Sequence, residues 1–474
     1  MSISPPTPLE KVVNSQFARL LVIGLMVLIL QIPTLFLFGV IRERQAIRQS
    51  AIEDVTSKWG REQTIVGPRL IVPYVKRSGT TEKPKSEQKF ATFLPDDLQI
   101  IGKMDTETRY RGLFQVPVYT GKLELKGKFE TLDFTSWGIK PDDVLWDRSE
   151  LVVQIADTRA ISTQVKLNWN KITIPFSPGL GKYETGSNAM PMPMPPESPL
   201  ASAEQRRDTR SSSVSSTTGI HVRLLKNVEE KKDYQFSIPI ELHGSERIGF
   251  VPLGKLTQVS LTSNWPNPSF QGGWLPESSK ISDTGFEAKW QIPFLGRNFP
   301  QQWNSETPIA DTVIYQSRFG VDLFAPVDNY HMAERSIKYN FLFIVLTFAV
   351  LWLFEVMVRL RVHPLQYLMI GVAMCLFYLL QLALSEHMGF HQAYVIASLS
   401  VVVLITSYTM SILRAKRRGG IVGVMQVALY SYLYVVLASQ NYSLLIGSVG
   451  LFIFLAIVMF LTRRVDWFGG AGQA

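Results

Sequence analysis

Cysteine and histidine, the residues that most often bind metals or act as nucleophiles, are scarce in this sequence. There is one cysteine, Cys375, and there are six histidines among 474 residues. A single thiol excludes a disulfide within the chain and a paired-cysteine metal motif. The sequence also lacks a phosphate-binding glycine-rich loop and a Gly-x-Ser-x-Gly nucleophile elbow. These absences give no support for an enzyme, so we expect no catalytic residues, no metal and no cofactor.

Charged side chains are nearly missing from six segments of 18 to 22 residues, at positions 20–41, 341–358, 365–384, 393–413, 421–438 and 444–462. A helix rises about 1.5 Å per residue, so about 20 apolar residues cross a hydrocarbon core about 30 Å thick. Because a backbone in lipid must satisfy its own hydrogen bonds, we predict that all six are membrane-spanning helices. Five of them fall within the last 134 residues, which is too many for the core of a soluble protein.

Lysine and arginine are absent from two alternate loops, residues 385–392 and 439–443. The other loops and the tail contain eight: Arg359, Arg361, Arg414, Lys416, Arg417, Arg418, Arg463 and Arg464. Basic loops stay in the cytoplasm, so both termini are predicted to be cytoplasmic and residues 42–339 to lie outside. That outer segment holds 38 Lys and Arg against 35 Asp and Glu, so the net charge of +9 does not indicate nucleic-acid binding.

The predicted organisation follows from these segments. Residues 1–19 form a cytoplasmic N-terminus and residues 20–41 a first spanning helix, which is too long for a cleaved signal peptide. Residues 42–339 form a domain outside the cytoplasm. Residues 340–462 form a block of five spanning helices, and residues 463–474 a cytoplasmic tail.

The outer domain is predicted to be rich in β-strands. Apolar and polar residues alternate along residues 122–129 and 234–242, as in strands with one buried face. Many short strands between turn residues favour an antiparallel, sandwich-like, two-lobed domain in an α+β membrane protein. Residues 44–59 are predicted to continue the first helix outward. Residues 182–218, rich in Met, Pro and Ser, are predicted to be a flexible insertion, with incidental methionines favoured over a copper site.

Six polar residues are candidates for function. Glu355 lies within a spanning segment, where a carboxylate suggests function, although an ion pair with Arg359 at the interface is the simpler explanation. Gln381 can bond between helices, and Glu386 with His387 closes a spanning segment as a polar cap. Gly389 favours a turn over a metal site formed by His387 and a following histidine. Arg61 and Arg111 stand beside aromatic residues, in salt bridges or as sites for a lipid head group or anionic glycan.

Several long strings resemble the CreD family of bacterial inner-membrane proteins. They are residues 59–74 (WGREQTIVGPRLIVPY), 109–119 (RYRGLFQVPVY), 236–255 (FSIPIELHGSERIGFVPLGK), 263–270 (SNWPNPSF), 297–303 (RNFPQQW), 334–339 (ERSIKY) and 363–390 (HPLQYLMIGVAMCLFYLLQLALSEHMGF). The resemblance implies a role in cell-envelope integrity and stress response, expression under a two-component system, and effects on colicin tolerance. It supplies no catalytic residues, and the insertion at 182–218 departs from the family.

The first functional hypothesis is therefore a non-enzymatic envelope protein of the inner membrane. Its periplasmic domain would bind or sense another envelope protein, a lipid or a glycan, while the helical block anchors it in the lipid bilayer or relays the signal. The second is a transporter or lipid-handling protein whose helical block forms a path lined by Glu355, Gln381 and Glu386. An unrecognised envelope hydrolase is the third.

Overall fold

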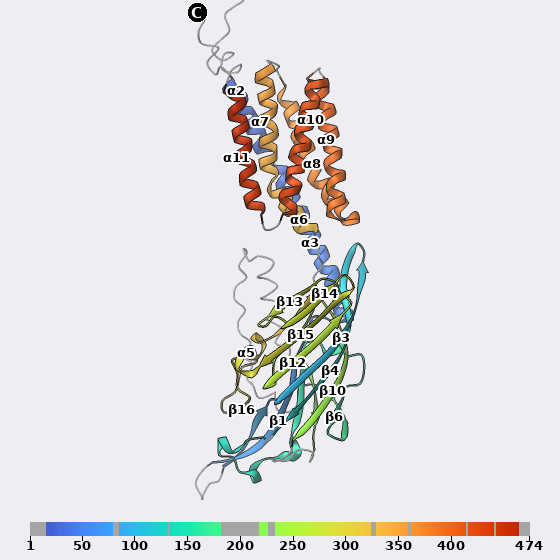
Figure 1. Ribbon diagram of the computed structural model, residues 1–474, viewed down its shortest axis with the longest axis vertical. Coiled ribbons are helices and arrows are strands. Elements are labelled where there is room, and N and C mark those ends of the chain that lie inside the picture. The colour runs from blue at the N-terminus through green and yellow to red at the C-terminus, as the bar shows by residue number, and fades with distance from the viewer. Residues whose placement is uncertain are drawn as a thin grey trace, which may run out of the picture. The chain divides into compact units, whose positions relative to one another are not determined.

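The computed structural model describes residues 16–78, 85–130, 132–181, 218–225, 233–323, 329–358, 362–413, 416–439 and 442–463. The chain forms two compact units: a helical unit, Met1–Gln49 with Val327–Ala474, and a β unit, Ser50–Pro326 (Figure 1). The predicted fold class is confirmed: an apolar N-terminal helix, a large β-rich domain and a C-terminal block of apolar helices. The insertion predicted at 182–218 lies outside the described residues except for Thr218.

The β unit contains two mostly antiparallel sheets. In the described part of the chain the first sheet has nine strands in the order β13-β17-β11-β1-β5-β9-β8, with β2 on β1 and β16 on β2. Their bounds are β1 Gln63–Ser78, β2 Lys85–Phe93, β5 Glu150–Ile155, β8 Ser177–Pro178, β9 Gly219–Arg223, β11 Arg247–Phe250, β13 Pro268–Gly272, β16 Gln302–Asn304 and β17 Phe319–Leu323.

The second sheet has eight described strands in the order β14-β15-β12-β3-β4-β10-β6-β7. Their bounds are β3 Asp97–Arg111, β4 Phe114–Phe129, β6 Lys166–Trp169, β7 Ile172–Pro175, β10 Tyr234–Ser245, β12 Leu256–Ser263, β14 Ser278–Ser282 and β15 Gly285–Pro293. Only β1 with β11 and β12 with β3 pair in parallel among these ladders. A short helix, α5, spans Asp311–Gln316.

Both sheets bury one face in a common apolar core. Leu123 and Leu125 of β4 and Ile238 of β10 contribute from the second sheet, and Ile65 and Leu70 of β1 from the first. The predicted alternation along β4 and β10 therefore reflects real burial. Strands from before and after the insertion enter both sheets, so the two halves of the domain are its sheets and not successive parts of the chain.

Pro239 lies in β10 at a position that is paired on one edge of the strand only. One edge of β10 pairs with β4, where Pro239 stands opposite Glu124. On the other edge, the ladder with β6 covers only Phe236 and Ser237. Proline has no N–H to donate, so it fits a position that the short neighbouring strand does not reach.

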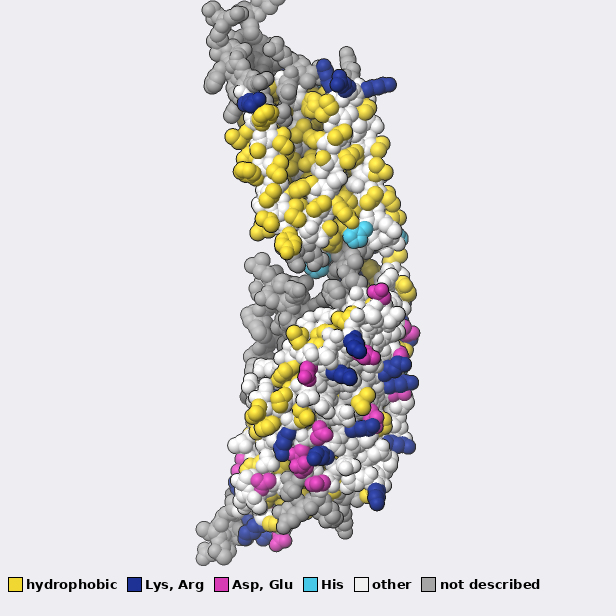
Figure 2. Space-filling model, viewed as in Figure 1, with side chains coloured by type: hydrophobic (Ala, Val, Ile, Leu, Met, Phe, Trp, Pro, Cys, Tyr) yellow, Lys and Arg dark blue, Asp and Glu magenta, His cyan; other side chains and the backbone are white. Residues whose placement is uncertain are grey.

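The helical unit consists of α2 Gln16–Ile29, the first part of α3 Gln31–Trp59, α6 Asn329–Lys338, α7 Asn340–Val358, α8 Pro364–Met388, α9 Phe390–Ile412, α10 Lys416–Ala438 and α11 Ser443–Thr462. Five described helices are long and apolar enough to cross a membrane, or six if the pair α6–α7, bent by 43°, is one span. In Figure 2 apolar side chains cover the visible face of this unit, and Lys and Arg side chains gather at one end.

Two local features refine the predicted helices. The segment 44–59 continues the first helix as predicted, since α3 runs unbroken from Gln31 to Trp59. Between α2 and α3 the helix is interrupted at Leu30, three residues before Pro33, whose missing N–H cannot bond the preceding turn. Helices α5 and α6 were not expected, because neither segment is a long apolar run. Helix α6 belongs to the helical unit, and the β unit comprises Ser50–Pro326.

Candidate functional site: a polar seam in the helical unit

Glu355 lies in the last turn of α7 and is buried, with 5% of its side chain exposed. Its Oε1 atom is 2.6 Å from Nη1 of Arg19 in α2. Its Oε2 atom accepts a hydrogen bond of 3.1 Å from the hydroxyl of Tyr367, at the start of α8. The predicted partner, Arg359, lies outside the described residues. An arginine 336 positions earlier in the chain therefore supplies the positive charge.

Glu386 lies near the other end of α8. Like Glu355, it contacts one tyrosine and one arginine. It accepts a hydrogen bond of 2.8 Å from the hydroxyl of Tyr330 in α6, and Nε of Arg44 in α3 lies 3.7 Å away. Its side chain is 11% exposed. Glu355 and Glu386 are thus each joined to one tyrosine and one arginine on other helices.

Between these two clusters, buried amides and hydroxyls connect α3, α6, α7 and α8. Asn340 donates to the hydroxyl of Thr34 at 2.6 Å, and its Nδ2 atom is 3.8 Å from Sγ of Cys375. Ser336 donates to Oε1 of Gln381 at 3.2 Å. These five side chains are all nearly inaccessible. They form two separate groups of contacts that lie between the Glu355 and Glu386 clusters along the helices.

We call this set the polar seam. It consists of Arg19, Thr34, Arg44, Tyr330, Ser336, Asn340, Glu355, Tyr367, Cys375, Gln381 and Glu386. Along α8 the seam runs from Tyr367 to Glu386, about 28 Å of helix and close to the thickness of a bilayer core. A second contact, Gln426 of α10 to Thr347 of α7 at 3.2 Å, lies beside it.

The structure keeps the predicted path residues apart. Gln381 is fourteen positions beyond Tyr367 on α8, about 21 Å along the axis from the residue that contacts Glu355. Glu355, Gln381 and Glu386 therefore belong to successive levels of the seam and do not converge on one cavity. A cavity of about 410 Å³ lies elsewhere, between α9 and α10, lined by residues such as Thr406 and Gly423.

His387 does not join the seam. It is exposed at the end of α8, and Gly389, with φ of 80°, separates that helix from α9. His391 falls on α9, where Nδ1 lies 3.0 Å from the hydroxyl of Tyr434. The two histidines thus stand on different helices, as the glycine between them suggests. Among the described residues, no group of three potential metal ligands is present.

In the β unit, the predicted arginines lie at the surface near the end of α3. Arg111 pairs with Asp54 at 3.1 Å, and both side chains are substantially exposed. Arg109 stacks over the ring of Trp59, with Cζ 3.5 Å from its centroid. The side chain of Arg61 is exposed. Exposed pairs of this kind stabilise a fold only weakly.

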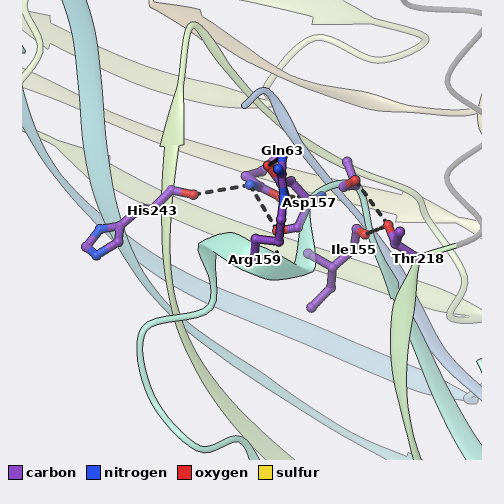
Figure 3. Close-up of polar contacts among 7 residues, drawn as sticks. Gln63, Ile155, Asp157, Arg159, Thr218 and His243 are labelled. Carbon is purple, nitrogen blue, oxygen red and sulfur yellow. Dashed lines mark hydrogen bonds and ion pairs between the residues drawn. The ribbon is translucent and has the colours of Figure 1, made fainter. Parts of the chain in front are cut away.

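A polar junction lies close to this surface (Figure 3). Buried Gln63 donates to the carbonyl oxygens of Asp157, at 3.5 Å, and His243, at 3.2 Å. Arg159 donates two hydrogen bonds to the carboxylate of Asp157, from Nε at 2.9 Å and from Nη2 at 3.0 Å. Burial alone would raise the pKa of Asp157, but the hydrogen bonds and charge of Arg159 outweigh burial and lower it. Thr218 closes the junction by donating to the carbonyl of Ile155 at 2.7 Å.

Sequence reasoning found the carboxylates of the seam but missed their partners. Arg19, Tyr330 and Asn340 were not among the predicted site residues. One signal was available: the buried polar residues at 336, 340, 347 and 355 are spaced by 4, 7 and 8 positions. Such spacing keeps side chains on one helical face.

The chain combines a bundle of apolar helices, which encloses buried polar side chains, with a large β domain. This combination is typical of an integral membrane protein with several spans. The chain belongs to the CreD family, since the sequence model of the family described as "Inner membrane protein CreD" matches residues 15–468. A relative of that name from Escherichia coli (strain K12) is 28% identical over 446 residues, or 93% of this chain and 91% of the relative. The chain is therefore a multi-pass inner-membrane protein.

Proposed function

We propose that this protein maintains the cell envelope, and that its β unit lies in the periplasm and binds or senses an envelope component. Both termini would then be cytoplasmic. The support for this orientation is the eight basic residues in one set of loops against none in the other.

The observation that carries the proposal is the continuity of α3. This helix supplies Thr34 and Arg44 to the polar seam. Farther along, its residues Ile52, Val55 and Trp59 pack on Val116 and Val118 of β4. A ligand that shifts β4 would therefore act on a helix that also carries seam residues.

The tip of the β3–β4 hairpin is the surface we assign to the ligand. Tyr110 is 67% exposed and Leu113 is 50% exposed, and Arg109 and Arg111 lie beside them. An exposed aromatic ring among arginines is typical of binding surfaces. This composition suits an anionic group on an envelope protein, lipid or glycan.

A complementation experiment tests the role of α3. In cells lacking the protein, we expect the wild-type chain to restore resistance to detergent. Gln45→Pro, which breaks the helix, should be inserted at normal levels and yet fail to restore resistance, while Gln45→Ala should succeed. Full complementation by Gln45→Pro would contradict a relay through α3.

A crosslinking experiment tests the assigned surface. A photoreactive phenylalanine at Tyr110 should give a reproducible adduct in intact cells. The same group at Leu295, which is 82% exposed in the same unit, is the control. Equal labelling at both positions would reject the hairpin tip as the binding surface.

The alternative, a transporter with a solute path through the helices, has less support. It required Glu355 and Gln381 to converge, and they contact different levels of the seam.

A further inference from the structure

The cavity between α9 and α10 is a groove on the lipid-facing surface of the helical unit. Its volume of about 410 Å³ is within the range of small-molecule pockets. Val403, Val424 and Val427 line it, and each of these side chains is more than half exposed. The groove therefore opens toward the surrounding hydrocarbon and not into the bundle.

Three glycines at the start of α10 have different roles in forming the groove. A Cβ atom at Gly419 would clash with Met410 of α9. A Cβ atom at Gly423 would lie 2.6 Å from Oγ1 of Thr406. These two glycines let the helices pack closely. By contrast, a Cβ atom at Gly420 would meet nothing within 4 Å, so the space beside this residue is open.

The lining of the groove suits an alkyl chain. It is almost entirely apolar. Ser407 donates its hydroxyl to the carbonyl of Val403, on its own helix, at 2.8 Å. The Oγ1 atom of Thr406 is inaccessible and lies against Gly423. A polar solute would lose its hydrogen bonds with water here, whereas an alkyl chain has none to lose.

The groove also has the direction and length that an acyl chain requires. From Gly420 to Val427 it runs for about 10 Å along α10. A leaflet occupies half of a hydrocarbon core about 30 Å thick, so the groove fits within one leaflet. A helix, which is about 10 Å across with its side chains, needs a wider groove over more turns.

Two cations stand at one end of the groove. Lys416 and Arg417 precede Gly420 by four and three positions, which places them on the same face of α10, about one turn away. Both side chains are exposed. The sequence has no Asp or Glu between Glu386 and Asp466, so no carboxylate of α9, α10 or α11 neutralises them. Basic residues in this position attract anionic lipid head groups.

We propose that this groove binds an anionic phospholipid. One acyl chain occupies the groove, and the phosphate of the head group contacts Lys416 and Arg417. The apolar groove and the cations at its end match the tail and the head of one amphipathic molecule. This binding is independent of the ligand of the β unit and of the orientation of the chain in the membrane.

Photolabelling of the purified full-length chain in nanodiscs tests the site. The probe is phosphatidylglycerol with a diazirine in one acyl chain, and labelled residues are mapped by mass spectrometry. We expect residues 420–427 to be labelled at least fivefold more than α11, although α11 is the more exposed helix. Phosphatidylcholine with the same diazirine should label them at least threefold less. Labelling no higher than that of α11, or equal labelling by both lipids, would overturn the proposal.

Filling the groove should displace the acyl chain. Gly420→Leu places a side chain in open space and should reduce labelling of α9 and α10 at least fivefold. Gly447→Leu on α11 is the matched control, because a Cβ atom there also meets nothing within 4 Å. It should leave the labelling of the groove unchanged.

Removing the cations should affect the choice of head group. Lys416→Gln combined with Arg417→Gln should make phosphatidylglycerol and phosphatidylcholine label the groove equally. Arg463→Gln, at the end of α11, should preserve the preference for phosphatidylglycerol. An undiminished preference in the double variant would contradict a phosphate contact with these two residues.

A second copy of the chain is the competing occupant, and the mass of the purified protein distinguishes it from lipid. Gly420→Leu should reduce labelling without changing the oligomeric state. If it instead converts a dimer to a monomer and leaves lipid labelling unchanged, the groove is an interface between copies and the proposal fails.

Discussion

Arg297 is a buried cation that contacts carbonyl oxygens of the β unit. Its Nη1 donates to the carbonyls of Pro252, at 3.0 Å, and Leu253, at 2.6 Å, and its Nη2 donates to Gln301. The guanidinium also lies 4.5 Å from the ring centroid of Phe299. Burial lowers its pKa to about 10, so it remains charged at neutral pH. One side chain thus holds the backbone at residues 252–253 and the side chain of Gln301.

Arg297→Met should lower the free energy of unfolding by about 2–3 kcal/mol, because it leaves two buried carbonyls without donors. The measurement is urea unfolding of the purified chain, followed by tryptophan fluorescence. Arg148→Met, at an exposed position, should stay within about 0.5 kcal/mol of the wild type. Equal effects of the two substitutions would show that the contacts with the carbonyls do not contribute to the free energy of unfolding.

Asp157 should make stability depend on pH in the acid range. Its pKa is lowered in the folded chain, relative to the ordinary 3.8, so its stabilisation is fully present above that value and is lost as pH falls through the lower, folded pKa. Because Arg159 is 68% exposed, we expect the pair to contribute only about 1 kcal/mol.

The check is the difference in unfolding free energy between the wild type and Asp157→Asn. It should be constant from about pH 7 to pH 5 and shrink below about pH 4. The matched variant Asp147→Asn, at an exposed aspartate, should show no such trend. A difference that grows on acidification would reverse the predicted sign.

At the scale of helices, the ion pair between Arg19 and Glu355 holds α2 to α7. Removing one charge leaves the other buried, which typically costs about 3–5 kcal/mol, whereas replacing both with apolar groups costs far less. Arg19→Met should therefore destabilise the detergent-solubilised protein more than the double variant with Glu355→Met. Thermal unfolding midpoints give the comparison. Additive effects of the two substitutions would exclude coupling between them.

An element could be predicted from the sequence when a pattern within its own residues indicates it. Apolar runs and alternation identified the spanning helices and strands such as β4 and β10, because burial imposes those patterns directly. The polar pairing of the seam was not predictable in the same way. Arg19 meets Glu355, and Thr34 meets Asn340, only after helices far apart in sequence have packed. Helix α6 was missed because it is too short and too polar to form an apolar run.

At the scale of the whole molecule, the proposed orientation gives a direct prediction. A reporter active only in the cytoplasm should work when fused after Leu413, and one active only in the periplasm should work after Ser439. These positions follow α9 and α10, on opposite sides of one span. As a control, replacing Lys416, Arg417 and Arg418 with Gln should weaken the bias. Reversed activities would show that the orientation is the opposite of the proposed one. They would not alter the description of the two structural units.

The pairing of strands in the β unit has a consequence for its biogenesis. β1 pairs with β11 through Gln63 and Ile248, and β2 pairs with β16 through Phe93 and Gln302. A nascent chain that has delivered only its first hundred outer residues can pair β1 with β2 but still lacks β11 and β16, the further partners of these two strands. If the β unit is exported as proposed, its first sheet cannot be completed on the far side of the membrane until nearly all of the unit has crossed. During that interval it depends on whatever keeps exposed strands from aggregating.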